Sequence, residues 1–246
     1  MTTGPLALDD AQKVWRYMSF SRFVWLLQNK QLWLSRVDRL DDSWEMALAG
    51  EQLEDVIARH PPPKMPSPDI QPESAIERSK RIETLWRQTT FISCWSASEH
   101  ESHALWRIYC GLNEGVAIQT TVGRLRKSVG SLRLSPVIYG APGSIRRTPN
   151  EIDLITNKRP MFEYEHEVRI VRLTQADVGD SLLGYPLDWN PELNLETIRV
   201  HPEADSSLMQ TVSAAVEHYA PALKDHIEWS AMKERRPLDP ATTEGS

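Results

Sequence analysis

The segment Glu165-His166-Glu167 offers two carboxylates at a spacing that suits acid–base or charge-stabilising chemistry. We predict that it lies in a strand over residues 162–173, FEYEHEVRIVRL. Residues i and i+2 of a strand share one face and lie about 7 Å apart. Two carboxylates so placed raise one another's pKa unless a cation or a ligand lies between them. The pattern therefore indicates either a site at the mouth of this strand or a solvated edge-strand face paired with Arg169 or Arg172.

Polar and aromatic residues of other segments are candidates to complete such a site. Ser93 lies among apolar residues at 89–95, and a buried hydroxyl needs a backbone partner or a ligand. Arg16 lies within the apolar run 14–18, where an arginine belongs to a sheet edge or points into a cleft. The aromatic candidates for stacking on a ligand, which would otherwise be core residues, are Tyr17, Trp106 and Tyr109.

Common nucleotide-binding, hydrolase and metal motifs are absent from the sequence. There is no Walker loop, no G-x-G-x-x-G and no G-x-S-x-G. His100 and His103 lack the H-E-x-x-H spacing and no C-x-x-C is present, so we expect no metal site. A metal-dependent nuclease or hydrolase remains an alternative, with Mg²⁺ held by carboxylates. Its candidate ligands are Asp38, Asp41, Asp42, Glu45, Glu165 and Glu167.

The candidate residues need strands and helices to position them. Short apolar runs predict strands at 14–18, 31–37, 89–95, 115–120, 132–139, 162–173, 195–200 and 227–229. Helical periodicity and capping residues predict helices after Ser19 or Ser21, and at 43–59, 73–88, 104–109, 123–127, 151–156 and 205–219. Because helices interrupt the strands at irregular intervals, the fold class is α+β.

Composition excludes several classes of protein. The chain has 246 residues, 40% hydrophobic and 25% charged, which is globular usage rather than that of a disordered or fibrous chain. A net charge of −6 disfavours binding to nucleic acid regardless of sequence. No apolar stretch approaches a membrane span, no signal peptide is evident, and two cysteines fit a reducing compartment, so we expect a cytoplasmic protein without membrane contact.

We expect one domain with short appendages. The domain covers residues 14–232, preceded by an N-terminal extension at 1–13 and followed by a flexible tail at 233–246. Six prolines make residues 61–72 a loop within it. In the Gly/Arg-rich loop at 140–147, Arg146 and Arg147 are candidates to face a phosphate or a nucleic acid.

The order of these motifs resembles the ADP-ribosyltransferase superfamily of the Arg–Ser–Glu type. The sequence presents a strand with an arginine, an F-I-S-x-x-S strand, a G-V-A-I strand and E-x-E-V-R-I. The resemblance implies a bent, split, mainly antiparallel sheet with outer helices. It also implies that NAD+ is the substrate. Because Ser-Cys-Trp-Ser stands where Ser-Thr-Ser is usual, Ser93 and Ser96 are both candidates for the motif serine.

Carried onto this sequence, the resemblance assigns a role to each site residue. Arg16 would bind the NAD+ diphosphate and Ser93 would orient the nicotinamide ribose. Tyr17, Trp106 or Tyr109 would wall the nicotinamide ring. Glu167 would hold the ribose 2′-hydroxyl and stabilise an oxocarbenium-like transition state. Glu165 would position or deprotonate the acceptor, a protein or a nucleic acid that the sequence does not specify.

A second resemblance covers nearly the whole chain but brings no activity with it. The pattern W-R-Y-M, L-W-L-S-R-V-D, F-I-S-C-W-S, Y-E-H-E-V-R-I and I-R-V-H-P-E-A resembles an uncharacterised bacterial domain-of-unknown-function family, number 2971. The first resemblance implies an NAD+-consuming ADP-ribosyltransferase, for which we expect the role of a bacterial toxin or phage-defence effector. The alternative is a non-catalytic binding module in which Glu165 and Glu167 pair with arginines.

Overall fold

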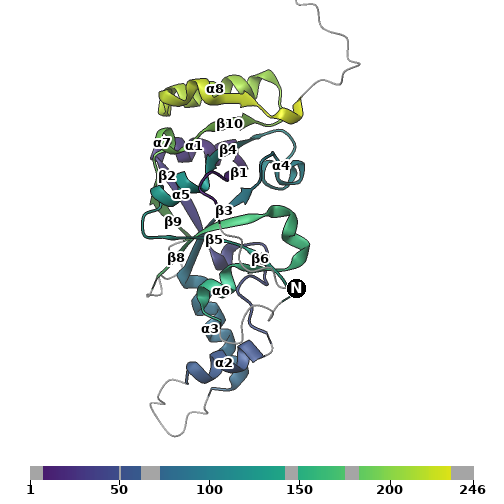
Figure 1. The fold of residues 1–246 in the computed structure, drawn as a ribbon, viewed down its shortest axis with the longest axis vertical. Coiled ribbons are helices and arrows are strands. Elements are labelled where there is room, and N and C mark those ends of the chain that lie inside the picture. The colour runs from purple at the N-terminus through teal and green to yellow at the C-terminus, as the bar shows by residue number, and fades with distance from the viewer. Residues whose placement is uncertain (1–7, 50, 62–72, 142–148, 175–182, 234–246) are drawn as a thin grey trace, which may run out of the picture.

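A computed structural model describes residues 8–49, 51–61, 73–141, 149–174 and 183–233 (Figure 1). Apart from residues at their ends, the Pro-rich segment, the Gly/Arg-rich loop with Arg146 and Arg147, and the C-terminal tail lie outside these ranges. The described residues form a mixed α/β structure, which agrees with the expected α+β class.

Nine strands of the described part form one sheet, in the order β11-β10-β4-β1-β3-β2-β9, with β8 on β3 and β5 on β8. Neighbouring strands are antiparallel except β10 and β11. The strands are β1 Lys13–Ser19, β2 Gln31–Arg36, β3 Thr90–Ala97, β4 Gly115–Thr121, β5 Arg133–Pro136, β8 Glu167–Leu173, β9 Gly184–Asp188, β10 Thr197–Val200 and β11 Ile227–Trp229. A separate parallel pair is formed by β6 Ile138–Tyr139 and β7 Asn157–Lys158.

Helices lie outside the sheet and at its ends. They are α1 Phe20–Asn29, α2 Glu51–Arg59, α3 Ala75–Thr89, α4 His103–Cys110, α5 Val122–Ser128, α6 Glu151–Ile155, α7 Pro191–Asn194 and α8 Ser206–Tyr219. The 3₁₀ helices are η1 Val37–Arg39, η2 Pro160–Glu165, η3 Pro221–His226 and η4 Ala231–Lys233. Figure 1 shows α8 at one end of the long axis and α2 and α3 at the other.

The sheet divides beside the middle of β3. Strands β1 and β2 both adjoin β3, but each pairs with it only at one end. The register pairs are Val14 with Ala97 and Trp15 with Ser96 for β1, and Ser35 with Ile92 and Arg36 with Phe91 for β2. In the described part of the chain, residues 93–95 therefore pair with β8 on one side and with no strand on the other. We call this opening between β1 and β2 the fork, and α1 connects the two strands across it.

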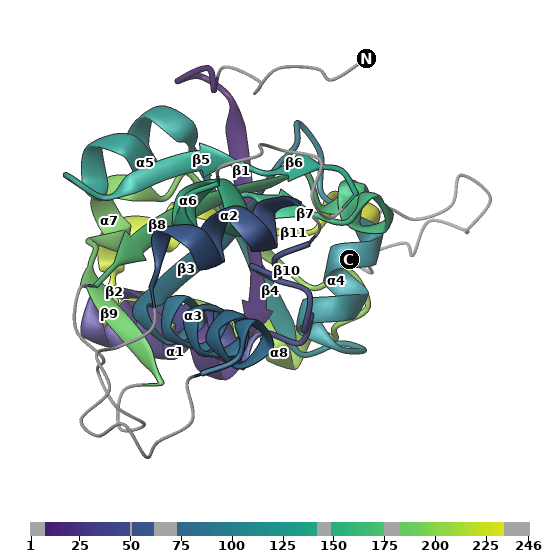
Figure 2. The ribbon, with the colours of Figure 1, turned by 90° about the horizontal axis from the view of Figure 1, so that it is seen from below.

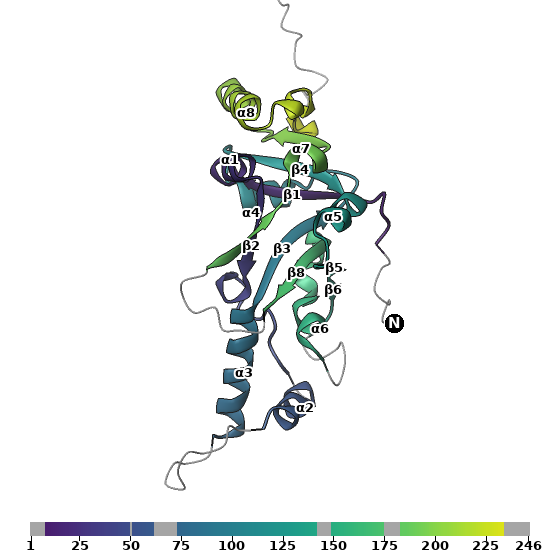
Figure 3. The ribbon, with the colours of Figure 1, turned by 90° about the vertical axis from the view of Figure 1, so that its left-hand side faces the viewer.

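Three hydrophobic cores hold the layers together. The largest packs α1, α5 and α8 on one face of the sheet, where Phe23, Leu125 and Val216 are fully buried. A small core beneath α4 contains Trp106 and Tyr17. The third joins α2, α3 and α6 to β3 and β8. Figure 3 shows α2 and α3 extending away from the sheet, and Figure 2 shows the molecule from that end, with these two helices in front.

Three predicted elements differ from the structure. Residues 43–49 are not helical, because Met46 has a positive φ of 60° and residues 43–46 form turns. The strand predicted at 162–173 begins only at Glu167, and η2 precedes it. The segment predicted as one strand at 132–139 divides into β5 and β6, which belong to different sheets.

Candidate functional site

Five charged residues form a buried cluster at the start of β8. They are Glu45, Lys158, Glu165, Glu167 and Arg169, which we call the ion cluster. Each side chain is less than one-tenth exposed. Two cations thus face three carboxylates away from water, where an uncompensated charge is costly.

Lys158 holds the two motif carboxylates together. Its Nζ donates to Glu165 Oε2 at 2.5 Å and to Glu167 Oε1 at 2.8 Å, and lies 3.7 Å from Glu45 Oε1. The same ammonium lies 4.6 Å from the ring centroid of Phe162, a cation–π contact. Lys158 is thus the cation that two close carboxylates require.

Arg169 closes the other side of the cluster. Its Nε donates to Glu167 Oε2 at 2.5 Å, while Nη1 and Nη2 donate to the two oxygens of Glu45 at 2.8 and 2.7 Å. Nη1 also donates to the carbonyl of Ile155, the last residue of α6, at 2.6 Å. The planar guanidinium therefore fixes the orientation of Glu167 relative to both Glu45 and α6.

The cluster separates the protonation states of the two motif glutamates. Burial raises the pKa of Glu165 to about 7, and its hydrogen bond with Glu167 adds to the effect. Burial acts in the same direction on Glu167, but Arg169, the hydrogen bond with Glu165, and Lys158 outweigh it and lower the pKa of Glu167. Glu167 is thus the ionised member of the pair, whereas Glu165 holds a proton near neutral pH.

The two glutamates do not share a strand face, contrary to the sequence prediction. Glu165 ends the 3₁₀ helix η2, His166 has a left-handed φ of 44°, and β8 starts at Glu167. The backbone N–H of Glu167 donates to the Tyr139 hydroxyl at 2.8 Å. A turn, rather than the pleat of a strand, therefore brings both carboxylates to Lys158.

The three motif strands are adjacent, in the order β8-β3-β1. Within them Glu167 pairs with Ser96, and Ser96 pairs with Trp15, so one row of residues crosses the sheet beside Arg16. Residues in register share a face. Ser96 therefore lies on the face of Glu167, whereas Ser93, three residues earlier, lies on the opposite face. By the same alternation Arg16, next to Trp15, lies on the face of Ser93, so Ser96 accompanies Glu167 and Ser93 accompanies Arg16.

A hollow of about 320 Å³ lies at the fork. We call it the fork hollow. Its lining comes from β1, α1 and β2, and consists of Arg16, Tyr17, Met18, Arg22, Trp25, Leu26, Trp33 and Ser35. The volume falls in the range of about 300–1,000 Å³ typical of small-molecule sites.

Buried polar atoms around the fork lack partners among the described residues. Arg16 donates from Nη2 to the Trp33 carbonyl at 3.0 Å, but its buried Nη1 has no partner. Ser93 Oγ and Trp95 Nε1 are also buried without a partner, and the Arg16 guanidinium lies 5.9 Å from the Trp95 ring. Burial lowers the pKa of Arg16 to about 10. Buried polar groups are normally satisfied, so these orphaned atoms mark a place for water or a ligand.

Cys94, which pairs with Arg169 in the register of β3 and β8, interacts electrostatically with the ion cluster and with Arg16 of the fork hollow. Burial raises the pKa of its thiol, and Glu167 and Arg169 act on it electrostatically, as the thiol itself acts on Arg16. Tyr109, on α4, is 45% exposed. The pKa of its hydroxyl is raised mainly by burial and, to a smaller extent, by the charge of Glu165 in the ion cluster. The two features are thus neighbours on one region of the protein.

One of the three predicted aromatic walls, Trp106, lies in a core instead of at a hollow. Trp106 is fully buried, packs edge-to-face on Tyr17 at 5.2 Å and donates to Glu101, so it belongs to the core beneath α4. Tyr17 lines the fork hollow, but its hydroxyl accepts the backbone N–H of Ser102 at 2.7 Å. Of the predicted aromatic residues, Tyr17 therefore lies at the fork hollow and Tyr109 near the ion cluster.

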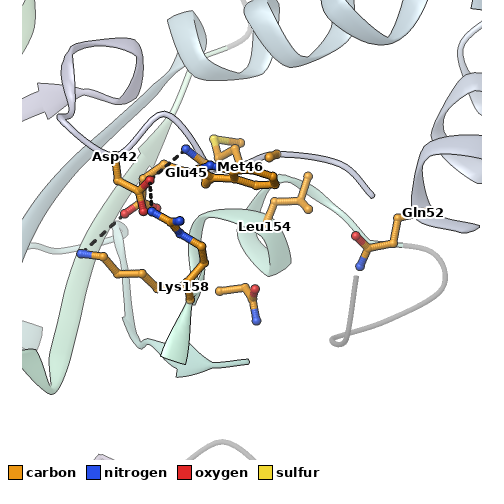
Figure 4. Close-up of a pocket in the computed structure, with 10 residues that line it drawn as sticks. Asp42, Glu45, Met46, Gln52, Leu154 and Lys158 are labelled. Atoms are coloured by element: carbon orange, nitrogen blue, oxygen red, sulfur yellow. Dashed lines mark hydrogen bonds and ion pairs between the residues drawn. The ribbon is translucent and has the colours of Figure 1, made fainter. Parts of the chain in front are cut away.

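A second hollow beside the ion cluster is too small for an organic ligand. It has a volume of about 20 Å³, enough for one water molecule, and Figure 4 shows Lys158 extending toward Glu45 beside Asp42.

Two of the carboxylates considered as metal ligands form ion pairs with arginines. Asp42 pairs with Arg159 at 3.0 Å, and Asp38 with Arg36 at 2.7 Å. Within the described ranges, no group of three or more potential ligands is arranged to hold a metal ion.

The sequence analysis missed several residues of this region. Lys158 lies in the ion cluster, and Arg22, Trp25 and Trp33 line the fork hollow. Lys158 lies within nine residues of the Glu-x-Glu motif, so a lysine close to paired carboxylates was an available signal, whereas Arg169 was already a candidate partner and does pair with Glu167. Arg22, Trp25 and Trp33 come together because α1 connects β1 to β2 and places its side chains beside both strands.

Comparison with protein-family models, with curated proteins and with solved structures yielded no match. None of the helices in the described ranges is both long and apolar enough to cross a membrane. The resemblance to ADP-ribosyltransferases therefore rests on the motifs of the sequence and their order.

Proposed function

We propose that this protein is an NAD+-consuming ADP-ribosyltransferase. The observation that carries the proposal is the adjacency of the three motif strands. Glu167, Ser96 and Trp15 form one row across them, and Arg16, the residue after Trp15, lines the fork hollow. An anionic dinucleotide suits a site that joins an arginine with an open donor to an ionised glutamate.

The geometry supports different roles for Arg16 at the fork hollow and Glu167 in the ion cluster. Arg16 binds the diphosphate through Nη1, which has no protein partner among the described residues. Glu167 carries a negative charge fixed in place by Lys158 and Arg169. It accepts a hydrogen bond from the nicotinamide ribose and stabilises positive charge that develops on the sugar. A preorganised charge of this kind stabilises a transition state without reorganisation.

The transfer step balances in atoms and charge. The bond between the ribose C1′ and the nicotinamide nitrogen breaks, and its electron pair leaves with the nicotinamide, which becomes neutral. An acceptor oxygen or nitrogen, or water, forms the new bond to C1′ and loses a proton. Glu165 has a pKa of about 7, so a fraction of the molecules carries it ionised at neutral pH, and in that form it can accept the proton.

Nicotinamide release from NAD+ tests the proposal. We expect the purified protein, with or without a bacterial lysate as a source of acceptor, to release nicotinamide. Glu167→Gln should lower the rate about 100- to 1,000-fold, the scale of losing one charge-stabilising group. Because Glu167 also belongs to the ion cluster, circular dichroism is used to check that the Glu167→Gln variant is folded. Ser96→Ala is a second test on the same face.

The exposed carboxylate Glu163 provides the matched control, because it lies on η2 outside the ion cluster. Glu163→Gln should keep the wild-type rate. Absence of release with and without lysate, together with no thermal shift on adding NAD+, would overturn the transferase proposal.

One observation favours a second candidate, a non-catalytic binding module. Both oxygens of Glu167 contact cations of the same chain, as expected of a structural ion pair. On this alternative Glu167→Gln lowers stability but changes no catalytic rate. A folded protein that binds NAD+ without releasing nicotinamide would support it.

A further inference from the structure

We propose that the fork hollow binds the nucleoside diphosphate end of the substrate, with the diphosphate on Arg16 and Arg22 and the base against Trp25 and Trp33. The nicotinamide end would then extend toward Glu167. The identity of the ligand rests on the proposed function, whereas the argument for the site rests on the residues of the hollow.

Two arginines line the hollow without a compensating carboxylate. Among the described residues neither Arg16 nor Arg22 forms a salt bridge, and Arg22 is close enough to lower the pKa of Arg16, after the larger effect of burial. Two guanidinium groups that repel one another favour an anion between them. Phosphate oxygens match the guanidinium fork in geometry and charge.

Two tryptophans supply the surface for a base. The rings of Trp25 and Trp33 meet edge-to-face with centroids 5.7 Å apart, and Trp33 is 38% exposed although it is large and apolar. An aromatic pair beside a cation offers an open face on which a base can stack. The Trp33 carbonyl accepts the Arg16 hydrogen bond, so the aromatic and cationic parts of the hollow are joined.

Gly184 makes room for the indole of Trp33. A Cβ at position 184 would lie 2.3 Å from Cε2 and Cζ2 of that ring, closer than any real contact. Strand β9 therefore needs glycine there for Trp33 to rest against it. A substitution at Gly184 therefore displaces the Trp33 ring while leaving the residue in place. Such a variant tests whether the position of the ring matters for binding.

Direct binding of ADP tests the inference. Isothermal titration calorimetry is run with ADP, inorganic pyrophosphate and nicotinamide. We expect ADP to bind more tightly than pyrophosphate and nicotinamide not to compete with it. Trp33→Leu should weaken ADP binding about 5- to 150-fold, the scale of losing one base–aromatic stack. Arg22→Gln and Gly184→Ala should weaken it in the same direction.

Matched controls lie outside the hollow. Trp44→Leu removes another exposed tryptophan, and Arg107→Gln removes another exposed arginine. Both should leave ADP affinity unchanged. Equal affinity for ADP and pyrophosphate would overturn the role of the tryptophans, and ADP binding unaffected by Arg22→Gln and Trp33→Leu would overturn the site. ADP binding without nicotinamide release would preserve this inference and overturn the proposed function.

Discussion

At the scale of single residues, the ion cluster holds more negative than positive charge. Lys158 and Arg169 face Glu45, Glu165 and Glu167, all buried. One bound proton completes the neutralisation, and the hydrogen bond between Glu165 and Glu167 gives that proton a place. The cluster can therefore exchange a proton near neutral pH while its geometry is kept by the two cations.

The pH dependence of stability should report this proton. The pKa of Glu165 rises from 4.5 to about 7 in the folded state, so the folded protein binds more protons than the unfolded chain between these values. The contribution is complete below about pH 4.5 and is lost as the pH rises through about 7. Glu165→Gln removes this titration, so the free energy of unfolding of wild type should fall relative to the variant across that window.

Chemical denaturation at several pH values measures the difference. Glu163→Gln, on the exposed side of the same 3₁₀ helix, is the control for loss of a charge. Parallel pH profiles of wild type and Glu165→Gln would contradict a proton held at Glu165.

At the scale of elements, the short helix α6 helps to hold the ion cluster in place. Its first turn is capped by Asn150, and its last residue contacts Arg169. Asn150 caps the helix by accepting the N–H of Asp153 at 2.9 Å, while Asp153 accepts the N–H of Asn150. The last residue, Ile155, accepts a hydrogen bond from Arg169. A five-residue helix has little stability of its own, so its cap matters to the site.

Asn150→Ala should lower the free energy of unfolding by about 1 kcal/mol, whereas Asn150→Gly should cost only a few tenths. Urea denaturation of both variants measures the difference. Equal losses for alanine and glycine would contradict the capping role.

Strong local signals explain which elements the sequence predicted. The caps and apolar faces of α3 and α8 and the apolar runs of β1, β3 and β4 all lie in the predicted segments. Strand β9 was missed because Pro186 argues against a strand, although an edge strand tolerates it. The turn at His166 was missed because a left-handed non-glycine residue leaves no pattern in the sequence.

The candidate site was less predictable than the fold. Glu165, Glu167 and Arg16 were identified from residue type and motif order; the structure brings the two glutamates together on Lys158 and places Arg16 at the fork hollow. Glu45 was weighed only as a metal ligand, yet it meets Arg169 124 residues later in the chain. Such a contact depends on tertiary packing, which no local pattern encodes.

At the scale of the whole molecule, α2 and α3 pack on a hydrophobic core separate from the one around α8. Figure 3 shows these helices extending away from the sheet. Their core reaches β3 and β8 through Ile92 and Val171, and Glu45 adds two hydrogen bonds to Arg169. The large core around α8 shares no buried residue with this one. The two ends of the molecule should therefore respond separately to a change at Glu45.

Glu45→Gln should loosen the α2–α3 end alone. Breaking a buried ion pair costs about 3–5 kcal/mol, and this loss falls on the segment that Glu45 attaches to β8. Hydrogen exchange followed by mass spectrometry should show faster exchange in α2, α3 and residues 40–49, with little change in α8, β4 and β10. Glu54→Gln, an exposed carboxylate on α2, should leave exchange unchanged everywhere. Uniform acceleration along the chain would instead mean that Glu45 stabilises one cooperative unit, with the ion cluster at its centre.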